Sequence, residues 1–210
     1  MTRLLGAALV AAALAAVGGV QAKAPPGGID LCGASGCSHI AGLEAEKLVT
    51  GWSASSAHPA APAPFFVLHV PSTATGGEIV FWVPAAKLVR RGGGFAAWSH
   101  PAAEAEAVLE QAAAGLEPLR LELTRVTVGG RPVRAPATYV RLFRRGRWMP
   151  GSSATHWLRV RFESAVPSPW TDDVAEYLLS RRGRDLVVDV DVVRIPAAVA
   201  QRARLGLPLP

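Results

Sequence analysis

Residues 157–162 read WLRVRF, a stretch in which every second residue is apolar and the residues between are Arg159 and Arg161. Side chains of a β-strand point alternately to its two faces, so this pattern predicts a strand with one buried face and one wet face. Half-buried strands of this kind are typical of antiparallel sheets. We therefore expect an antiparallel sheet in this part of the 210-residue chain.

Outward from this strand, the same series of features occurs twice in the chain, at offsets of 91 to 95 residues. Each half begins with two short apolar stretches around a glycine turn, then has a short helix, a strand and a hairpin that starts at Glu78 or Glu176. Each half ends with an alanine-rich helix, for which a proline marks the first turn and a glycine the end. The matched segments are 29–40 with 123–133, 43–51 with 137–146, 65–70 with 157–162, and 101–115 with 196–206.

These matches predict an α+β fold, mostly antiparallel β-sheet with short helices, built as two tandem pseudo-repeat units. Valines that alternate with Asp189 and Asp191 predict one further strand over 188–192. The other interpretation is that two α+β segments rich in alanine and arginine look alike without common origin.

The N-terminus predicts export. Arg3 precedes an apolar run over 4–20, and the small residue Ala22 suits signal peptidase. The alternative is an uncleaved membrane anchor, but the run of 17 residues is shorter than the roughly 20 of a spanning helix. The predicted organisation is a signal peptide over 1–22, a linker over 23–28, a first unit over 29–118 and a second unit over 119–210.

The two cysteines, Cys32 and Cys37, flank a turn-forming Gly-Ala-Ser-Gly tetrad. In an oxidising compartment this pair predicts a structural disulfide. Four residues separate the cysteines, whereas a redox motif has two, and no further cysteine or paired histidine stands nearby to suggest zinc. We therefore predict no metal site, and the absence of a phosphate loop or dinucleotide fingerprint predicts no cofactor.

Several motifs carry a resemblance to a family. They are CGASGC at 32–37, VPAAKLVRR at 83–91, and PSPWTD at 167–172 followed by RIPAAVA at 194–200. On these motifs the chain resembles secreted proteins of the high-GC Gram-positive (actinobacterial) type that have no assigned function. The resemblance implies export, and it implies nothing about chemistry because none of the motifs is a catalytic signature.

Positive charge is concentrated in the middle of the chain. Between Arg120 and Arg161 lie ten arginines and one acid, a balance of +9, whereas the rest of the mature chain carries −4. Such asymmetry steers an anionic partner if the fold gathers the arginines on one surface. Guanidinium groups bind phosphates, and interleaved aromatic side chains such as Tyr139, Phe143 and Trp157 could stack on sugars. The candidate binding residues are Arg141, Arg144, Arg145, Arg147 and Trp148.

The bland interpretation is that these arginines form the wet face of a sheet and that the aromatic residues form its core. We nevertheless favour a non-enzymatic extracytoplasmic binding or scaffolding protein that contacts an anionic envelope polymer or a membrane surface. Nucleic acid is disfavoured as a partner because envelope polymers and lipid headgroups are the polyanions nearest to an exported protein.

The alternative is a secreted hydrolase with its active site in the cleft between the two units. Its acid–base set would be Asp172, Asp173, Glu176 and His156. No Gly-x-Ser-x-Gly elbow and no His-Glu-x-x-His motif is present in the sequence. We therefore predict no catalytic residue for the favoured, non-enzymatic function.

Overall fold

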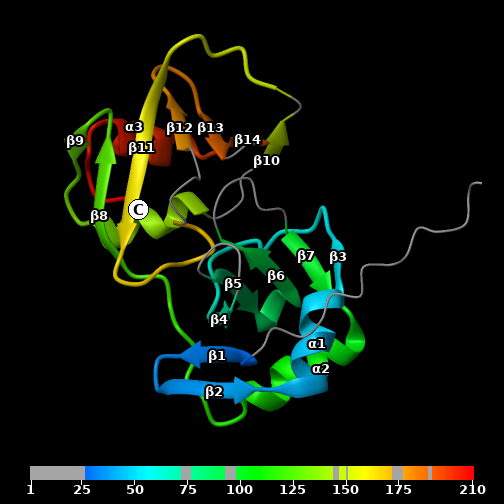
Figure 1. The fold of residues 1–210 in the computed structure, drawn as a ribbon. Coiled ribbons are helices and arrows are strands. Elements are labelled where there is room, and N and C mark those ends of the chain that lie inside the picture. Colours follow the sequence, from blue (N-terminus) through cyan, green and yellow to red (C-terminus); the bar gives the residue numbers. More distant parts are fainter. Residues whose placement is uncertain are drawn as a thin grey trace, which may run out of the picture.

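The structure, a computed structural model, contains two seven-stranded antiparallel sheets and short helices (Figure 1). It describes residues 27–71, 77–92, 98–143, 147–149, 151–171, 177–188 and 191–210, with the backbone alone at 147–149 and 191. The predicted α+β class, mostly antiparallel sheet with short helices, is confirmed.

The first sheet is built from the first unit, in the strand order β2-β1-β4-β5-β6-β7-β3. Helices α1 and α2 pack on one face of it, and the short 3-10 helix η1 joins β5 to β6. The bounds are β1 (Ile29–Gly33), β2 (Gly36–Ile40), α1 (Gly42–Thr50), β3 (Trp52–Ala54), β4 (Phe66–Val70), β5 (Glu78–Val83), η1 (Pro84–Ala86), β6 (Leu88–Arg91), β7 (Trp98–Pro101) and α2 (Ala103–Ala113).

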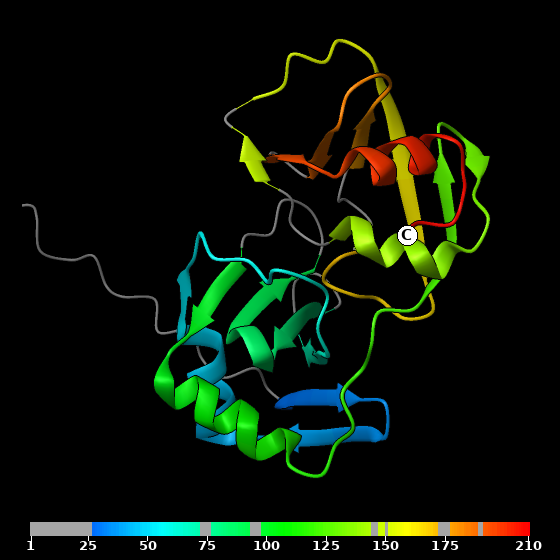
Figure 2. The ribbon, with the colours of Figure 1, turned by 180° about the vertical axis from the view of Figure 1, so that it is seen from behind.

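The second sheet is built from the second unit, in the order β10-β14-β13-β12-β11-β8-β9. The 3-10 helix η2 and the helix α3 pack on one face of it, which is turned to the viewer in Figure 2 (yellow-green and red). The bounds are β8 (Leu123–Val128), β9 (Arg131–Pro132), η2 (Pro136–Phe143), β10 (Arg147–Met149), β11 (Trp157–Ser164), β12 (Tyr177–Ser180), β13 (Asp185–Val188), β14 (Asp191–Arg194) and α3 (Ala197–Arg204).

The two sheets have the same topology. Read from its other end, the order of the second sheet is β9-β8-β11-β12-β13-β14-β10. Each of its strands then has the position of the first-sheet strand whose number is lower by seven, so that β11 corresponds to β4 and β12 to β5. The helical segments also fall at matching places in the chain, because α1 and η2 follow the first hairpins and α2 and α3 follow the last strands. Shared topology supports the two-unit repeat without showing common descent, so the duplication stays a prediction.

The first sheet separates two hydrophobic cores. Phe66 and Leu68 of β4 pack with α1 and α2, whereas Phe65 and Val67 belong to a core that also contains residues of the second unit. The alternation of side chains along the strand produces this division. In β11, Val160 is buried and Leu158 and Phe162 pack against the same core, which is the alternation expected from WLRVRF.

Three local predictions differ from the structure. Val188 pairs with Asp191 in adjacent antiparallel strands, so the single strand over 188–192 is wrong. Pro101 ends β7 opposite Trp52 and does not begin a helix. The helix over 137–146 is a 3-10 helix that ends at Phe143, with 144–146 outside the described residues. The glycine ends of the last helices are right, since Gly115 and Gly206 have φ of 84° and 66°.

Candidate functional site

The predicted disulfide is present and lies in the β1–β2 hairpin. Cys32 and Cys37 are opposite each other in the two strands and are bonded. The hairpin turn is held to the end of the first unit, because the Ala34 N–H donates to the Glu117 carbonyl at 2.6 Å and the Glu117 N–H donates to Ser35 Oγ at 2.8 Å. The disulfide has a structural role here and fits an extracytoplasmic protein.

The five predicted binding residues are only partly placed. Arg141 is exposed on η2. Arg144 and Arg145 lie outside the described residues. The backbone of β10 pairs Arg147 with Arg194 and Trp148 with Val193, at the edge of the second sheet.

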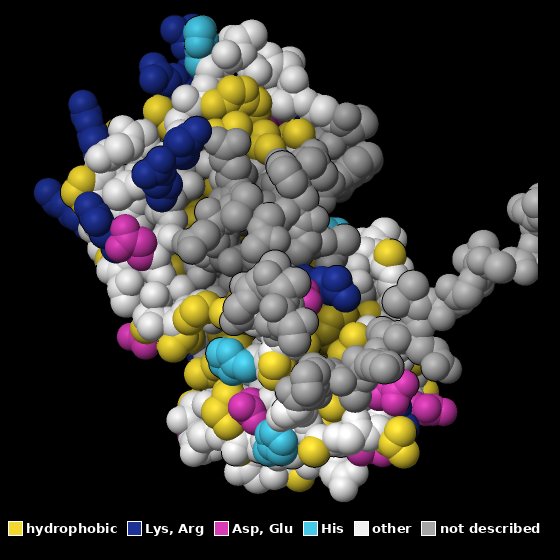
Figure 3. All heavy atoms as spheres, in the orientation of Figure 1, with side chains coloured by type: hydrophobic (Ala, Val, Ile, Leu, Met, Phe, Trp, Pro, Cys, Tyr) yellow, Lys and Arg dark blue, Asp and Glu magenta, His cyan; other side chains and the backbone are white. Residues whose placement is uncertain are grey.

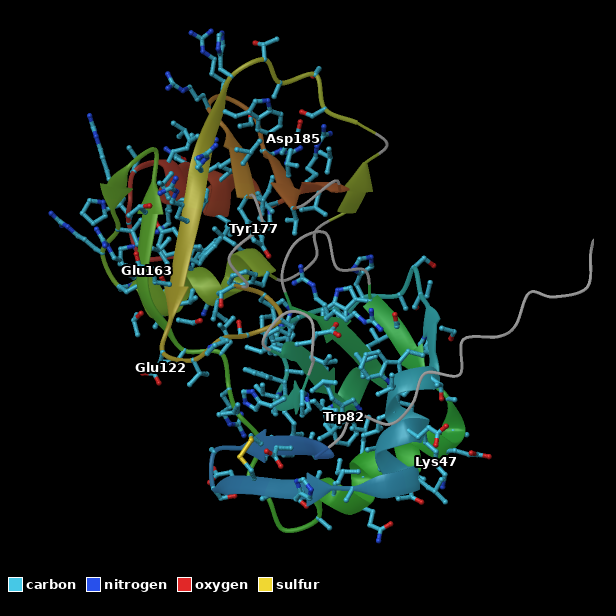
Figure 4. All side chains as sticks on the ribbon, viewed as in Figure 1. Lys47, Trp82, Glu122, Glu163, Tyr177 and Asp185 are labelled. Carbon is cyan, nitrogen blue, oxygen red and sulfur yellow. A yellow bond between two sulfur atoms is a disulfide. The ribbon has the colours of Figure 1, made fainter. Side chains whose placement is uncertain are left out.

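Eight other arginines of the second unit have no acidic partner among the described residues. Two are in ion pairs at 3.3 Å, Arg125 with Glu163 and Arg194 with Asp185. Both carboxylates are labelled in Figure 4. Within the described part of the chain, eight further arginines of this unit are exposed and make no ion pair: Arg120, Arg131, Arg134, Arg141, Arg161, Arg181, Arg182 and Arg184. Figure 3 shows basic side chains gathered along the second unit and acidic ones mainly on the first.

The face of the second sheet away from η2 and α3, which we call the outer face, combines arginines with apolar residues. The strand pairing places Arg159, Leu178, Val187 and Val192 in one row across β11, β12, β13 and β14. Arg159 is exposed, and the three apolar residues are partly exposed and belong to neither hydrophobic core. Arg161, on the same side of β11 as Arg159, is also exposed. This face is therefore basic at the β11 side and apolar in its middle.

Two of the aromatic residues considered for stacking are in the core. Tyr139 is fully buried and Phe143 is 6% exposed, so neither can stack on a ligand. The Tyr139 hydroxyl donates to the Leu207 carbonyl at 3.0 Å, and burial raises the pKa of Tyr139 to about 12. Trp157, at the start of β11, is the partly exposed one.

The predicted acid–base set is not assembled in the described structure. Asp172, Asp173 and Glu176 lie outside the described residues, and His156 is exposed just before β11. Where the two units meet, Trp170 packs against Phe65, with ring centroids 5.8 Å apart. The described aromatic side chains at this contact belong to one hydrophobic core, and Arg90 donates a hydrogen bond to the Pro169 carbonyl beside them.

Sequence reasoning missed a row of titratable residues on the first sheet. Asp30 of β1 lies opposite His39 of β2 and His69 of β4, and His39 Nδ1 is 2.7 Å from Asp30 Oδ1. Only the register of three strands brings these residues together. No local sequence motif could therefore have identified them. Among the described residues, no three His, Cys, Asp or Glu side chains are placed to hold a metal ion.

Comparison with family models, with curated proteins and with solved structures finds no match for this chain. Within the part of the chain that is described, no helix has the length and apolar character needed to cross a membrane.

Proposed function

We propose that this protein is a secreted, non-enzymatic binding protein that contacts an anionic polymer of the cell envelope through its second unit. One observation carries the proposal, namely that the two units have opposite charge balances. The first unit, 29–118, has four basic and eight acidic residues, whereas the second, 119–210, has sixteen arginines and eight acidic residues.

The arginines of the second unit are available for such a polymer. Eight of those whose side chains are described are exposed and make no ion pair, so their charge is not neutralised within the chain. An excess of one sign over one surface raises the local concentration of oppositely charged molecules. A guanidinium group also binds a phosphate through two parallel hydrogen bonds. A polyphosphodiester is therefore the ligand chemistry that this surface fits best.

The mechanism predicts a strong dependence on salt. At 0.1 M ionic strength, charges about 10 Å apart are already largely screened. Each exposed arginine–phosphate contact contributes on the order of 0.5 kcal/mol, so useful affinity needs several contacts at once. Binding to a long polymer provides them, because the repeating phosphates reach many arginines together.

The test is binding of the mature chain, residues 23–210, to a polyglycerol phosphate polymer across a salt series, with DNA and anionic vesicles as competing probes. Two variants remove arginines from different places: Arg144→Ala/Arg145→Ala/Arg147→Ala, and Arg131→Ala/Arg134→Ala/Arg161→Ala. We expect each variant to lose about tenfold in affinity at low salt, since three such contacts sum to about 1.4 kcal/mol.

A matched control removes three charges from the first unit, in the variant Lys47→Ala/Lys87→Ala/Arg91→Ala. Each of these residues is in an ion pair, with Glu44, Glu106 and Glu78 respectively. The control should bind the polymer as the parent does. Equal losses in all three variants, or salt-independent binding, would overturn the proposal.

A further inference from the structure

The common topology makes the two sheets comparable residue by residue. Strand β4 is the counterpart of β11. In the first sheet, a row of paired residues runs across β5, β6 and β7 through Phe81, Arg90 and Trp98. The matching row of the second sheet runs across β12, β13 and β14 through Leu178, Val187 and Val192. The face of the first sheet that carries Phe81, Arg90 and Trp98 is therefore the counterpart of the outer face of the second.

In the first unit this face is covered by the second unit. Trp98 is 6% exposed and its ring centroid lies 6.3 Å from that of Trp170. Arg90 is 4% exposed and donates a hydrogen bond to the Pro169 carbonyl. Phe65 pairs with Leu119 and packs against Trp170. In the first unit, this face of the sheet is therefore the surface on which the second unit packs.

In the second unit, the described helices cover only the opposite face of the sheet. Leu178, Val187 and Val192 stay partly exposed, and Arg159 and Arg161 stand exposed beside them on β11. A partner for this outer face needs a surface that carries negative charge and some apolar area.

The α1–α2 layer of the same chain has these properties. It carries Glu44, Glu46, Glu104, Glu106 and Glu110. Glu44 and Glu106 are paired with lysines, at 2.9 and 2.7 Å, whereas the other three make no ion pair among the described residues. Leu43 at the start of α1 is 75% exposed. Both ribbon views place this layer on the side of the first unit that faces away from the second (Figures 1 and 2).

We propose that the outer face of one copy binds the α1–α2 layer of a second copy. The two surfaces lie on different units and cannot meet within one chain, so the contact is heterologous and each pair of bound copies leaves one surface of each kind open. The product is a head-to-tail chain of copies. An anionic polymer bound at the same arginines would compete with this contact, and the experiment therefore measures both.

The test uses two charge-reversed variants of the mature chain in sedimentation velocity at low salt. Arg159→Glu/Arg161→Glu blocks the outer face, and Glu104→Lys/Glu110→Lys blocks the helix layer. The parent should form concentration-dependent oligomers, and each variant alone should be monomeric, with association weakened at least tenfold. An equimolar mixture should associate again into oligomers, because the acidic outer face of one variant is complementary to the basic helix layer of the other, and the two unchanged surfaces also remain complementary.

A charge-matched control, Arg181→Glu/Arg182→Glu, places the same change in the β12–β13 turn and should oligomerise as the parent does. A monomeric parent, or a mixture that stays monomeric, would overturn the inference, as would an outer face that binds anionic vesicles while copies do not associate. The helix-layer variant should keep its affinity for polyglycerol phosphate. If polymer binding is absent while the parent and the mixed variants oligomerise, the proposed function fails and the self-association stands.

Discussion

Replacement of Trp170 by alanine tests whether the two units fold as one. The side chain is 6% exposed and lies between Phe65 and Trp98 of the first unit. Burial of about 200 Å² of aromatic surface at about 25 cal/mol per Å² gives an upper value of about 5 kcal/mol. Loss of a buried tryptophan side chain costs about 3 to 5 kcal/mol in well-packed cores. We expect Trp170→Ala to lower the free energy of unfolding by about 4 kcal/mol.

The measurement is urea unfolding followed by far-UV circular dichroism and by tryptophan fluorescence, with Trp170→Phe as the conservative variant and Leu205→Ala as the control. Leu205 is 63% exposed, so its loss should change stability by less than about 0.5 kcal/mol. Because Trp170 contacts the first unit, both probes should shift together in the alanine variant. A loss below about 1 kcal/mol, or a second transition that leaves the first sheet at its original stability, would refute this account of the contact.

Three further outcomes follow from single contacts. Reduction of the disulfide, which closes a loop with a sequence separation of 5, should lower the free energy of unfolding by about 2 kcal/mol, and the Cys32→Ser/Cys37→Ser variant should show no further loss under reductant. Gly33→Ala should cost about 1 to 3 kcal/mol by thermal unfolding, because the added methyl group overlaps the Glu117 carbonyl, while Gly151→Ala serves as a comparison with open space around it. Ionisation of Tyr139 should destabilise the fold at high pH: its pKa is about 12 folded and 10 unfolded, so the stabilisation is complete below pH 10 and about 2 to 3 kcal/mol is lost by pH 12. Denaturant titrations of Tyr139→Phe should lack that loss, and a parallel decline in parent and variant would contradict the assignment.

Much of the fold could be predicted from local patterns. The alternation in β11, the CGASGC hairpin and the glycine helix ends depend on neighbouring residues, and all three are present in the structure. The short edge strands β3 and β10 were not predicted, since three residues carry too little periodicity to detect. The single strand over 188–192 failed for a related reason, because both arms of a hairpin can continue the same alternation of valine and aspartate.

The sequence alignment of the two halves was shifted by one residue at the last helix of each half. Aligning Pro101 with Pro196 predicted a proline at the start of both helices. The strand pairing instead makes Ser99 equivalent to Val193, which matches Pro101 with Ile195 and Ala102 with Pro196. Proline is tolerated as the last residue of β7, because no neighbouring strand needs a backbone N–H at that position. Only the hydrogen-bonding partners distinguish the two alignments.

The candidate site was harder to predict because it depends on which face of a sheet is covered. The sequence places arginines between Arg120 and Arg161 but does not show that Tyr139 and Phe143 lie in the core. It also does not show that arginines outside this segment, at 181, 182 and 184, extend the basic surface. The sequence shows where the arginines lie along the chain. Their arrangement on one surface could be seen only once the register of the seven strands was known.

The difference between the two equivalent faces indicates why the units are not interchangeable. The first unit has Phe65, Phe81 and Trp98 where the second has Trp157, Leu178 and Val192. Three aromatic side chains bury about 450 to 750 Å² together, which is as large as the largest apolar patch of a typical monomer. The first unit alone would expose that patch, so residues 29–118 expressed without the second unit should aggregate or bind a hydrophobic dye. A soluble, dye-silent first unit would show instead that its sheet face does not need Trp170 and the core around it.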